Sequence, residues 1–243
     1  MRKKIHHILD KLRLKGIAGV LDSELDLADK NGTPVSEFLY RLLCQEHKHR
    51  RERSLMYRLQ QAKIPWNFSL NSFPFELQPG VRKHQIQALG QLAFIQNAEN
   101  IVFIGNPGVG KSGLAVGLLR NAVVEGYRGR FYNAQDLLDE LYSSLADRTT
   151  PKFIRRLFNY DLLVIDELGY LTLKPEQVNA FFKLMGERYG KKSTIITTNL
   201  DYQQWYELFD RQSLVDALLD RLKHRCITIK IDGPSLRIPA SED

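Results

Sequence analysis

The chain has 243 residues, of which 43% are apolar, enough for one α/β domain with a smaller unit attached. No apolar run reaches the length of a signal peptide or a membrane span, and neither cysteine, Cys44 or Cys226, has a partner at metal-ligand spacing, so we expect a cytoplasmic protein without a membrane partner. The formal net charge of +7 favours an acidic partner such as nucleic acid, and most of the positive excess lies in residues 1–60.

Two helices are predicted at the start of the chain. The first covers about 3–15 and ends near Gly16, because apolar residues recur there at helical spacing. These residues are Ile5, Ile8, Leu9 and Leu12. A second helical pattern follows over about 17–29.

A third helix is predicted from Thr33 and Pro34, which suit the N-cap and the first helical position, to about residue 62. Its middle, residues 46–53, is strongly polar and mostly basic. A solvated helix face and a surface that meets phosphates or an acidic partner would both have this composition. We expect residues 1–63 to form a helical N-terminal domain that binds a partner or DNA.

Residues 64–80 break the helical periodicity and are expected to link the N-terminal domain to a second domain, residues 81–243, which opens with a helix over 81–97. The linker is rich in proline and aromatic residues: Pro65, Trp66, Phe68, Phe73, Pro74, Phe75 and Pro79. The rings suit two roles, packing at the seam between the domains or packing beside the adenine of a bound nucleotide.

A Gly-rich loop lies between a predicted strand over 101–104 and a predicted helix over 111–125. Residues 105–112 satisfy the phosphate-loop pattern G-x-x-x-x-G-K-[ST] in the strand, loop and helix context that it requires. Lys111 is placed to reach the β- and γ-phosphates, and the Ser112 hydroxyl to ligate magnesium. We therefore predict a nucleoside triphosphate site. The residues assigned to it are Gly105, Asn106, Pro107, Gly108, Val109, Gly110, Lys111, Ser112 and Gly113.

A short helix over 151–159 has one basic face and one apolar face, and follows a predicted strand over 129–132 and a predicted helix over 134–145. The basic residues fall at i, i+3 and i+4 and are Lys152, Arg155 and Arg156. No acidic residue lies between Lys152 and Tyr160. A solvated charged face and a surface that contacts phosphates are both compatible with this pattern.

An unbroken apolar strand over 162–166 ends in two carboxylates, Asp166 and Glu167. Continuous apolar runs are typical of parallel strands buried on both faces, and in open α/β folds ligands bind at the C-terminal ends of such strands. Asp166 is suited to hold magnesium through its water shell. Glu167 is suited to orient and deprotonate the water that attacks the γ-phosphate.

The remaining elements alternate between helix and strand. A helix over 175–189 precedes a strand over 193–198 that ends at Asn199, and a helix over 213–224 precedes a last strand over 226–231. The Asn199 amide could bond the γ-phosphate or the attacking water, although asparagine at a strand end is often only a turn former.

These segments together resemble the AAA+ ATPases of the DnaA and DnaC initiator and loader branch. The resemblance rests on the phosphate loop at 105–112, Asp166 with Glu167, Thr198 with Asn199, and Leu219 to Leu222 with Arg221. Within that branch the chain is most similar to the IstB family, the transposition helper ATPases of bacterial insertion sequences. The resemblance implies an α/β fold: an AAA+ P-loop NTPase core whose parallel five-stranded sheet is sandwiched by helices, preceded by a small all-helical N-terminal domain and without a separate C-terminal lid domain.

The resemblance also assigns roles at the nucleotide site. Asn199 corresponds to sensor 1, and Arg221 matches the arginine finger that completes the ATP site of a neighbouring subunit, with Arg225 as a rival. The implied catalytic residues are Lys111, Glu167, Asn199 and Arg221. Arg237 resembles a nucleotide-binding sensor 2 arginine and lies in a tail expected to be extended from residue 233 onward.

The helices between residues 134 and 159 occupy the position of the helical insertion that marks initiator-type members and contacts the DNA backbone. The resemblance therefore puts forward Lys152, Arg155 and Arg156 as DNA contacts.

Family resemblance implies an ATPase that uses ATP and Mg²⁺ and assembles as a homo-oligomer, with ATP sites at subunit interfaces, on double-stranded DNA with little sequence preference. It would recruit and stimulate a partner transposase. The alternative is a DnaC-like replicative helicase loader with the same core and a different partner bound by residues 1–60. A third hypothesis is a DNA-binding scaffold that is gated by nucleotide binding and hydrolyses ATP only incidentally.

Overall fold

The structure, a computed structural model, describes residues 1–169, 171 and 173–237, and the chain divides into two compact units, Met1–Tyr57 and Arg58–Asp243. The first unit is helical. It contains α1 (Arg2–Lys11), α2 (Lys15–Asn31) and most of α3 (Val35–Ala62), whose last turns belong to the second unit. Its small core consists of Leu9, Ile17, Leu21 and Leu42.

The end predicted for the first helix was wrong. Helix α1 stops at Lys11, and Arg13 follows with a left-handed φ of 58°. Gly16 lies inside α2, where an added Cβ would come within 2.8 Å of the Cα of Glu46. The glycine therefore allows α2 to pack closely on α3, and it does not terminate a helix.

Glu46 begins the polar stretch in the middle of α3, yet its side chain is only 7% exposed. Its Oε2 accepts the backbone N–H groups of Gly16 (2.8 Å) and Ile17 (3.2 Å), and its Oε1 accepts Nε of Arg50 (2.7 Å). Burial alone would raise the pKa of Glu46, but the hydrogen bonds from Arg50 and from both N–H groups outweigh it and lower that pKa. This carboxylate caps the start of α2.

The second unit is built on a five-stranded sheet in the order β2-β3-β4-β1-β5, and every pairing is parallel. The strands are β1 (Asn100–Gly105), β2 (Gly129–Asn133), β3 (Leu162–Asp166), β4 (Ser193–Thr198) and β5 (Cys226–Ile231). The predicted parallel five-stranded sheet is confirmed. Because the strands are parallel, all their carboxyl ends lie at one edge, where the phosphate loop and both carboxylates follow.

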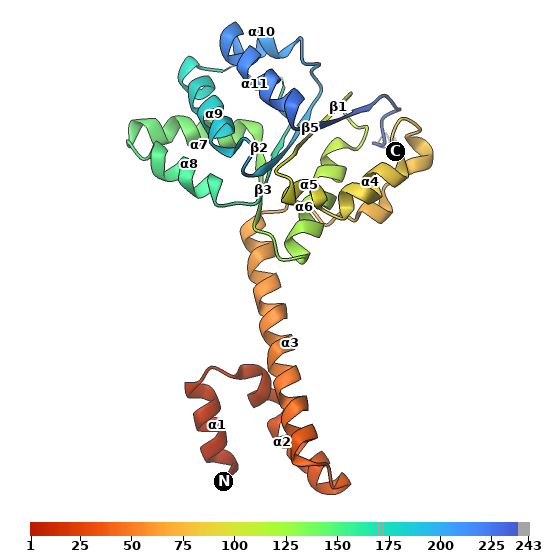
Figure 1. Ribbon diagram of the computed structural model, residues 1–243, viewed down its shortest axis with the longest axis vertical. Coiled ribbons are helices and arrows are strands. Elements are labelled where there is room, and N and C mark those ends of the chain that lie inside the picture. Colours follow the sequence, from red (N-terminus) through yellow and green to blue (C-terminus); the bar gives the residue numbers. More distant parts are fainter. Residues whose placement is uncertain (170, 172, 238–243) are drawn as a thin grey trace, which may run out of the picture. The chain divides into compact units, whose positions relative to one another are not determined.

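Helices cover both faces of this sheet (Figure 1). On one face lies α6 (Lys111–Val124), with α4 (Lys83–Gly90) beside it. The other face carries α7 (Ala134–Ala146), α8 (Thr150–Phe158), α9 (Pro175–Arg188) and α11 (Gln212–His224). Side chains alternate along a strand, so Val102 and Ile104 join the core with α7 to α11. Ile101 and Phe103, which alternate with them along β1, are fully buried toward the other face.

Three short elements differ from the prediction. The helix expected over 81–97 is two helices, α4 (Lys83–Gly90) and α5 (Ala93–Gln96), separated by Leu92 with a left-handed φ of 66°. Leu92 is 2% exposed, so the break turns an apolar side chain into the core. Helix α10 (Trp205–Phe209) was not predicted; Trp205 and Phe209 are buried in it.

The predicted linker, 64–80, lies within the second unit and contains two 3-10 turns, Leu70–Ser72 and Phe75–Leu77. Two of its aromatic rings pack on the phosphate-loop region: Phe68 lies over Gly113, and Phe73 over Gly110. After β5, residues 232–237 form neither helix nor strand, and Ile238 and Pro239 of the predicted extended tail lie outside the described residues. None of the described helices is long and apolar enough to span a membrane.

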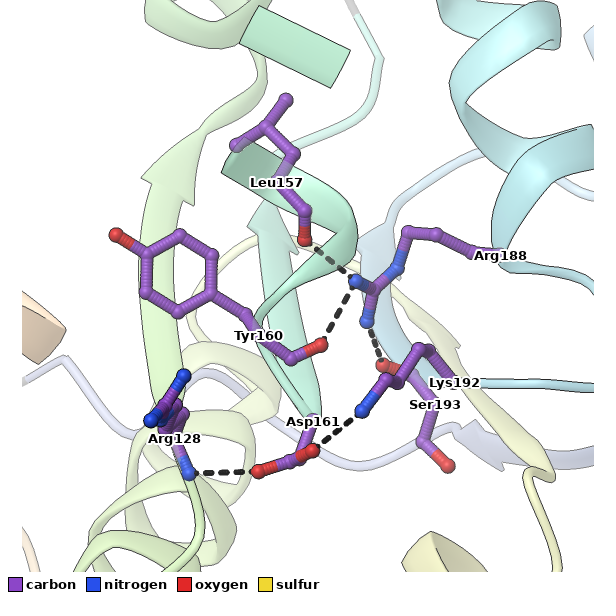
Figure 2. Close-up of polar contacts among 7 residues, drawn as sticks. All are labelled: Arg128, Leu157, Tyr160, Asp161, Arg188, Lys192 and Ser193. Atoms are coloured by element: carbon purple, nitrogen blue, oxygen red, sulfur yellow. Dashed lines mark hydrogen bonds and ion pairs between the residues drawn. The ribbon is translucent and has the colours of Figure 1, made fainter. Parts of the chain in front are cut away.

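A buried arginine fixes the amino ends of β3 and β4 (Figure 2). Arg188, 1% exposed at the end of α9, donates through Nη1 to the carbonyls of Leu157 (2.7 Å) and Tyr160 (2.9 Å), and through Nη2 to the carbonyl of Ser193 (2.5 Å). Burial lowers the pKa of Arg188 to about 9. The guanidinium thus satisfies carbonyls at the end of α8 and holds that helix to the start of β4.

Asp161 adds a second connection at the same edge. Its carboxylate accepts Nζ of Lys192 (2.5 Å) and the backbone N–H of Arg128 (3.0 Å), as Figure 2 shows. The turn before β3 is therefore tied to the segments that lead into β2 and β4.

Candidate nucleotide site

The phosphate-loop segment joins the end of β1 to the start of α6. Gly108 and Gly110 have φ of 84° and 96°, left-handed values that favour glycine. Gly110 is the N-cap of α6, whose first N–H groups have no acceptor within the helix and carry the positive end of its dipole. The segment therefore presents the backbone donors that a phosphate group requires.

Lys111 is half-buried within this loop. Its Nζ donates to the carbonyls of Gly105 and Asn106, both at 2.8 Å. Burial lowers the pKa of Lys111, while the nearby carboxylates of Asp166 and Glu167 act in the opposite direction. The amine is thus held beside the loop and the two acids, with only main-chain carbonyls to release before it meets a phosphate.

Asp166 is the last residue of β3 and is 4% exposed. Thr197 Oγ1 donates to its Oδ1 at 2.5 Å. Burial raises the pKa of Asp166, and hydrogen bonds from Thr197 and Ser112 oppose that rise. The Ser112 hydroxyl and the Asp166 carboxylate therefore lie together, although they come from α6 and β3, and both are oxygen ligands of the kind Mg²⁺ prefers.

The residues that the structure describes contain no group of three or more His, Cys, Asp or Glu side chains that could hold a metal ion. Ser112 and Asp166 would thus supply only part of a coordination shell. Magnesium bound through one or two protein oxygens takes its remaining ligands from phosphate and water, so the pair fits a cation that arrives with a nucleotide.

Glu167 follows β3 in a left-handed conformation, with φ of 63°, which is uncommon for any residue other than glycine. Its backbone N–H donates to Thr197 Oγ1 (2.9 Å), and its Oε2 accepts Nδ2 of Asn133 (3.2 Å). Thr197 thus holds both the Asp166 side chain and the Glu167 backbone. The carboxylate of Glu167 is directed by a second residue, Asn133.

Asn133 is a site residue that the sequence reasoning missed. It ends β2 and pairs in register with Asp166 of β3, so its side chain reaches the neighbouring acidic turn. Its Oδ1 also caps α7 by accepting the N–H of Gln135 at 3.0 Å. An asparagine between a predicted strand and a predicted helix was a visible N-cap signal, but the contact with Glu167 depends on which strand lies beside β2.

Most of the predicted nucleotide residues line one open cleft of about 1330 Å³. From the predicted set it contains Pro107, Gly108, Gly110, Lys111, Ser112, Gly113, Asp166, Glu167, Asn199 and Arg237. Asn199 also lies against Gly169, just beyond the two carboxylates. Of the remaining loop residues, Val109 is fully buried, and Gly105 and Asn106 direct carbonyls to Lys111.

The cleft extends well beyond these residues. Its further lining includes Trp66, one of the linker rings considered for packing beside the adenine. It also includes Lys63, Asp136, Asp139 and Glu140, which were not predicted. Ligand pockets commonly measure about 300–1,000 Å³. The cleft is therefore larger than a single nucleotide would fill.

Arg221 and Arg225 both lie outside the described cleft lining. Arg221, on α11, packs over the ring of Tyr189 with 6.0 Å between Cζ and the ring centroid. Arg225 Nη1 donates to the carbonyl of Asn97 at 3.1 Å, within its own chain. Neither guanidinium is therefore placed to act on the phosphates bound by its own subunit.

Helix α8 has the expected two-sided character. Lys152, Arg155 and Arg156 are exposed, while Phe153 and Leu157 are buried. The three basic residues lie away from the cleft, on the helix that Arg188 fixes at its carboxyl end.

Arg156 differs from the other two because a neighbouring helix supplies an acid. Its Nη2 lies 3.2 Å from Oε2 of Glu140 on α7, and its Cζ lies 4.7 Å from the ring centroid of Phe153. Although α8 itself contains no acidic residue, one of its three cations is therefore paired with an acid from another helix. Glu140 also lines the nucleotide cleft and accepts the Tyr132 hydroxyl at 3.4 Å.

The family model described as "IstB-like ATP binding protein" matches residues 7–243. The chain belongs to this family. An ATP-binding protein of insertion sequence IS21 from Pseudomonas aeruginosa is 35% identical over 231 residues, covering 95% of this chain and 87% of that protein. Another, of insertion sequence IS5376 from Geobacillus stearothermophilus, is 33% identical over 238 residues, covering 98% and 95%.

Solved structures establish the AAA+ fold of this IstB-like chain. The DnaC helicase loader has a TM-score of 0.53 and 28% identity, covering 61% of this chain and 87% of that one. The replication initiator DnaA bound to AMPPCP and single-stranded DNA has a TM-score of 0.57 and 19% identity, covering 68% and 49%. The predicted family, the α/β fold and a nucleotide-binding role linked to insertion sequences are confirmed.

Proposed function

We propose that this IstB-like protein is an ATPase that regulates DNA transposition. One observation carries the hydrolytic part: Asp166 and Glu167 emerge from β3 directly beside Lys111 and Ser112 of the phosphate loop. That arrangement joins triphosphate binding to a carboxylate that can act on water.

Each residue has a separate task in this proposal. The loop N–H groups and Lys111 bind the triphosphate, and Ser112 and Asp166 hold Mg²⁺. Mg²⁺ held there would supply positive charge against the phosphate oxygens. Glu167 accepts the proton of the water that attacks the γ-phosphorus, the bond to the β–γ bridging oxygen breaks, and ADP and inorganic phosphate leave. Asn199 orients the water or the γ-phosphate, and Arg237 binds the nucleotide at the mouth of the cleft.

Assembly would complete the site. Arg221 is half-buried against Tyr189 and lies outside its own subunit's cleft, which has room beyond one nucleotide. We therefore assign Arg221 to the ATP site of a neighbouring subunit in a homo-oligomer, where such a residue is worth about 10³–10⁵ in rate. Arg225 is the alternative, although its bond to Asn97 would first have to break.

The DNA-binding part of the proposal rests on α8. Lys152 and Arg155 are exposed on one face, and Arg156 is exposed but paired with Glu140. Three cations on a helix of nine residues suit contacts with the phosphates of double-stranded DNA, which carry no sequence information. Residues 1–63, the proposed N-terminal domain, would bind the partner transposase or DNA, and residues 81–243 the nucleotide.

A DnaC-like helicase loader is the second candidate, because the DnaC structure is 28% identical to this chain. Transposition is preferred, since insertion-sequence relatives are 33–35% identical over nearly the whole chain. The test is ATP hydrolysis by the full chain with DNA, with and without a candidate partner transposase or a replicative helicase. We expect stimulation by DNA and by the transposase. Stimulation by the helicase alone would favour the loader, and hydrolysis that neither DNA nor a partner changes would contradict both.

A further inference from the structure

The phosphate loop packs against the chain segment that follows β5. A Cβ added at Gly105 would collide with the carbonyl oxygen of Ile231, and one added at Gly108 would collide with Oγ of Ser235. A Cβ at Gly110 would lie 3.2 Å from Cδ1 of Leu236. Three glycines of the loop therefore meet one short segment, residues 232–237 and the strand end before it. We call residues 232–237 the strap.

Two hydrogen bonds attach the strap. The Leu236 N–H donates to the carbonyl of Gly108 at 2.8 Å, which joins the strap to the middle of the loop. Nε2 of Gln78 donates to the carbonyl of Pro234 at 2.6 Å, across 156 positions of sequence. Gln78 thus holds the strap from one side while the phosphate loop holds it from the other.

Gln78 is an unusual residue for its position. It is fully buried, and among the described residues its Oε1 has no hydrogen-bond partner. Gly233 lies directly against this amide, where any side chain would collide with it. A buried amide with an unpaired oxygen is destabilising, and an apolar side chain of similar shape would avoid that cost. The bond to the strap is the only function that the described contacts give this amide.

We propose that Gln78 is a positioning residue that holds the strap against the phosphate loop, and that the strap keeps the loop in its nucleotide-binding shape. A glycine-rich loop has many alternative conformations, so a ligand that must order it binds less tightly than one that finds it ordered. The strap supplies that order through its contacts with Gly105, Gly108 and Gly110, and its last two residues, Leu236 and Arg237, also line the cleft. The inference rests on the nucleotide site proposed above and adds its positioning device.

The test measures binding of a fluorescent ATP analogue, MANT-ATP, to the unmodified full chain and to variants of it. Gln78→Met keeps the side-chain volume but loses the donor, and Leu236→Ala removes the strap's packing on Gly110. Loss of one hydrogen bond should raise the Kd by about 2- to 12-fold in Gln78→Met, with a similar rise in Leu236→Ala. The double variant should be no weaker than the weaker single variant, because both release the same strap. Gln96→Met, outside the site, should bind as the unmodified chain does.

Hydrogen exchange of the peptide that contains Leu236 distinguishes a positioning role from a packing role. A Gln78 side chain that only fills the core would not affect the exchange rate of that peptide. Exchange there should accelerate in Gln78→Met while exchange in β1 stays unchanged. A lowered Tm with unchanged Kd and unchanged Leu236 exchange would show that Gln78 only fills the core, and would overturn the proposal. If Gln78→Met does not fold, unchanged MANT-ATP binding by Leu236→Ala would overturn it instead.

The variant Lys111→Ala distinguishes failure of the strap proposal from failure of the proposed nucleotide site. If Lys111→Ala loses MANT-ATP while both strap variants bind normally, the strap is wrong and the nucleotide site stands. If Lys111→Ala binds MANT-ATP normally, the nucleotide site itself is wrong.

Discussion

Asn133 donates a hydrogen bond from Nδ2 to Oε2 of Glu167 at 3.2 Å, and the same side chain caps α7 through its Oδ1. The residue proposed to deprotonate water is thus restrained by the residue that begins the neighbouring helix. Helix α7 also carries Glu140, which pairs with Arg156 of α8. The same helix is therefore in contact with the residue that restrains Glu167 and with the basic surface of α8.

Replacing Asn133 with Ser should separate its two roles. Serine remains a good N-cap but is too short to reach Glu167, so a freed carboxylate should raise ATP hydrolysis without DNA by about 2- to 10-fold. Asn133→Ala should show the same rise together with a lower Tm, because it also loses the cap. Steady-state ATPase assays and thermal melts measure the two effects. Hydrolysis by Asn133→Ser at the unmodified rate would mean that the bond does not restrain Glu167.

Removing the basic residues of α8 should weaken DNA binding equally for all sequences. Lys152→Ala and Arg155→Ala should each reduce the slope of log K against log salt by about one, because each would release one phosphate contact. Arg156→Ala should have a smaller effect, since Glu140 already pairs with that guanidinium. Fluorescence anisotropy over a salt series gives the slopes. Lys183→Ala, an exposed lysine on α9, is the charge-matched control.

The pairing of Arg156 gives a companion test. Glu140→Gln should release the guanidinium for phosphate and strengthen DNA binding, whereas in an Arg156→Ala background it should have no such effect. Unchanged slopes in the α8 variants would show that its basic residues form a solvated face and do not contact DNA.

Mixing two inactive variants should restore activity if the arginine finger acts between subunits. Lys111→Ala lacks a functional loop but keeps Arg221, and Arg221→Ala has the reverse defect. Mixed oligomers would contain some complete sites, so ATPase activity should recover toward about one quarter of normal at equal amounts when each site joins two randomly placed subunits. Arg225→Ala in place of Arg221→Ala tests its rival. No recovery with either arginine would contradict a site shared between subunits.

Acid should lower the stability of the first unit, Met1–Tyr57, because it protonates the Glu46 carboxylate. The folded-state pKa of this carboxylate is lowered, so its stabilisation is complete above the ordinary glutamate pKa and is lost as pH falls through the lowered value. Gln in its place keeps the shape and an acceptor for the N–H groups of α2 but removes the charge. The Tm difference between the unmodified chain and Glu46→Gln, measured by circular dichroism, should be positive at neutral pH and shrink in acid. A difference that does not change with pH would contradict the assigned role.

Local sequence patterns predicted the elements whose causes are local. The phosphate loop could be recognised because its glycines, Lys111 and the flanking strand and helix lie within one short stretch. Asp166 and Glu167 could be recognised because they end a continuous apolar strand, which also indicated a parallel sheet. The helix pattern of α8 likewise gave the correct buried and exposed faces.

Residues that act through distant partners could not be found in this way. Gly16 looked like a helix stop because its close approach to Glu46 involves another helix. The left-handed Leu92 is favoured by burial in the folded core, and nothing in its local sequence predicts it. Gln78 meets Pro234 only because the strand order brings the two ends of the domain together.

Glu167 is proposed to activate the water that hydrolyses ATP held by the phosphate loop, and comparing Glu167→Gln with the unmodified chain tests this role most directly. Nucleotide occupancy and phosphate release would be measured in the same samples, with DNA and Mg²⁺ present. Glutamine keeps the Asn133 contact and the phosphate contacts but cannot accept a proton. We expect ATP occupancy to be unchanged and phosphate release to fall by at least about 10²-fold, with the protein retained on DNA. Phosphate release at the ordinary rate by fully occupied Glu167→Gln would contradict the account.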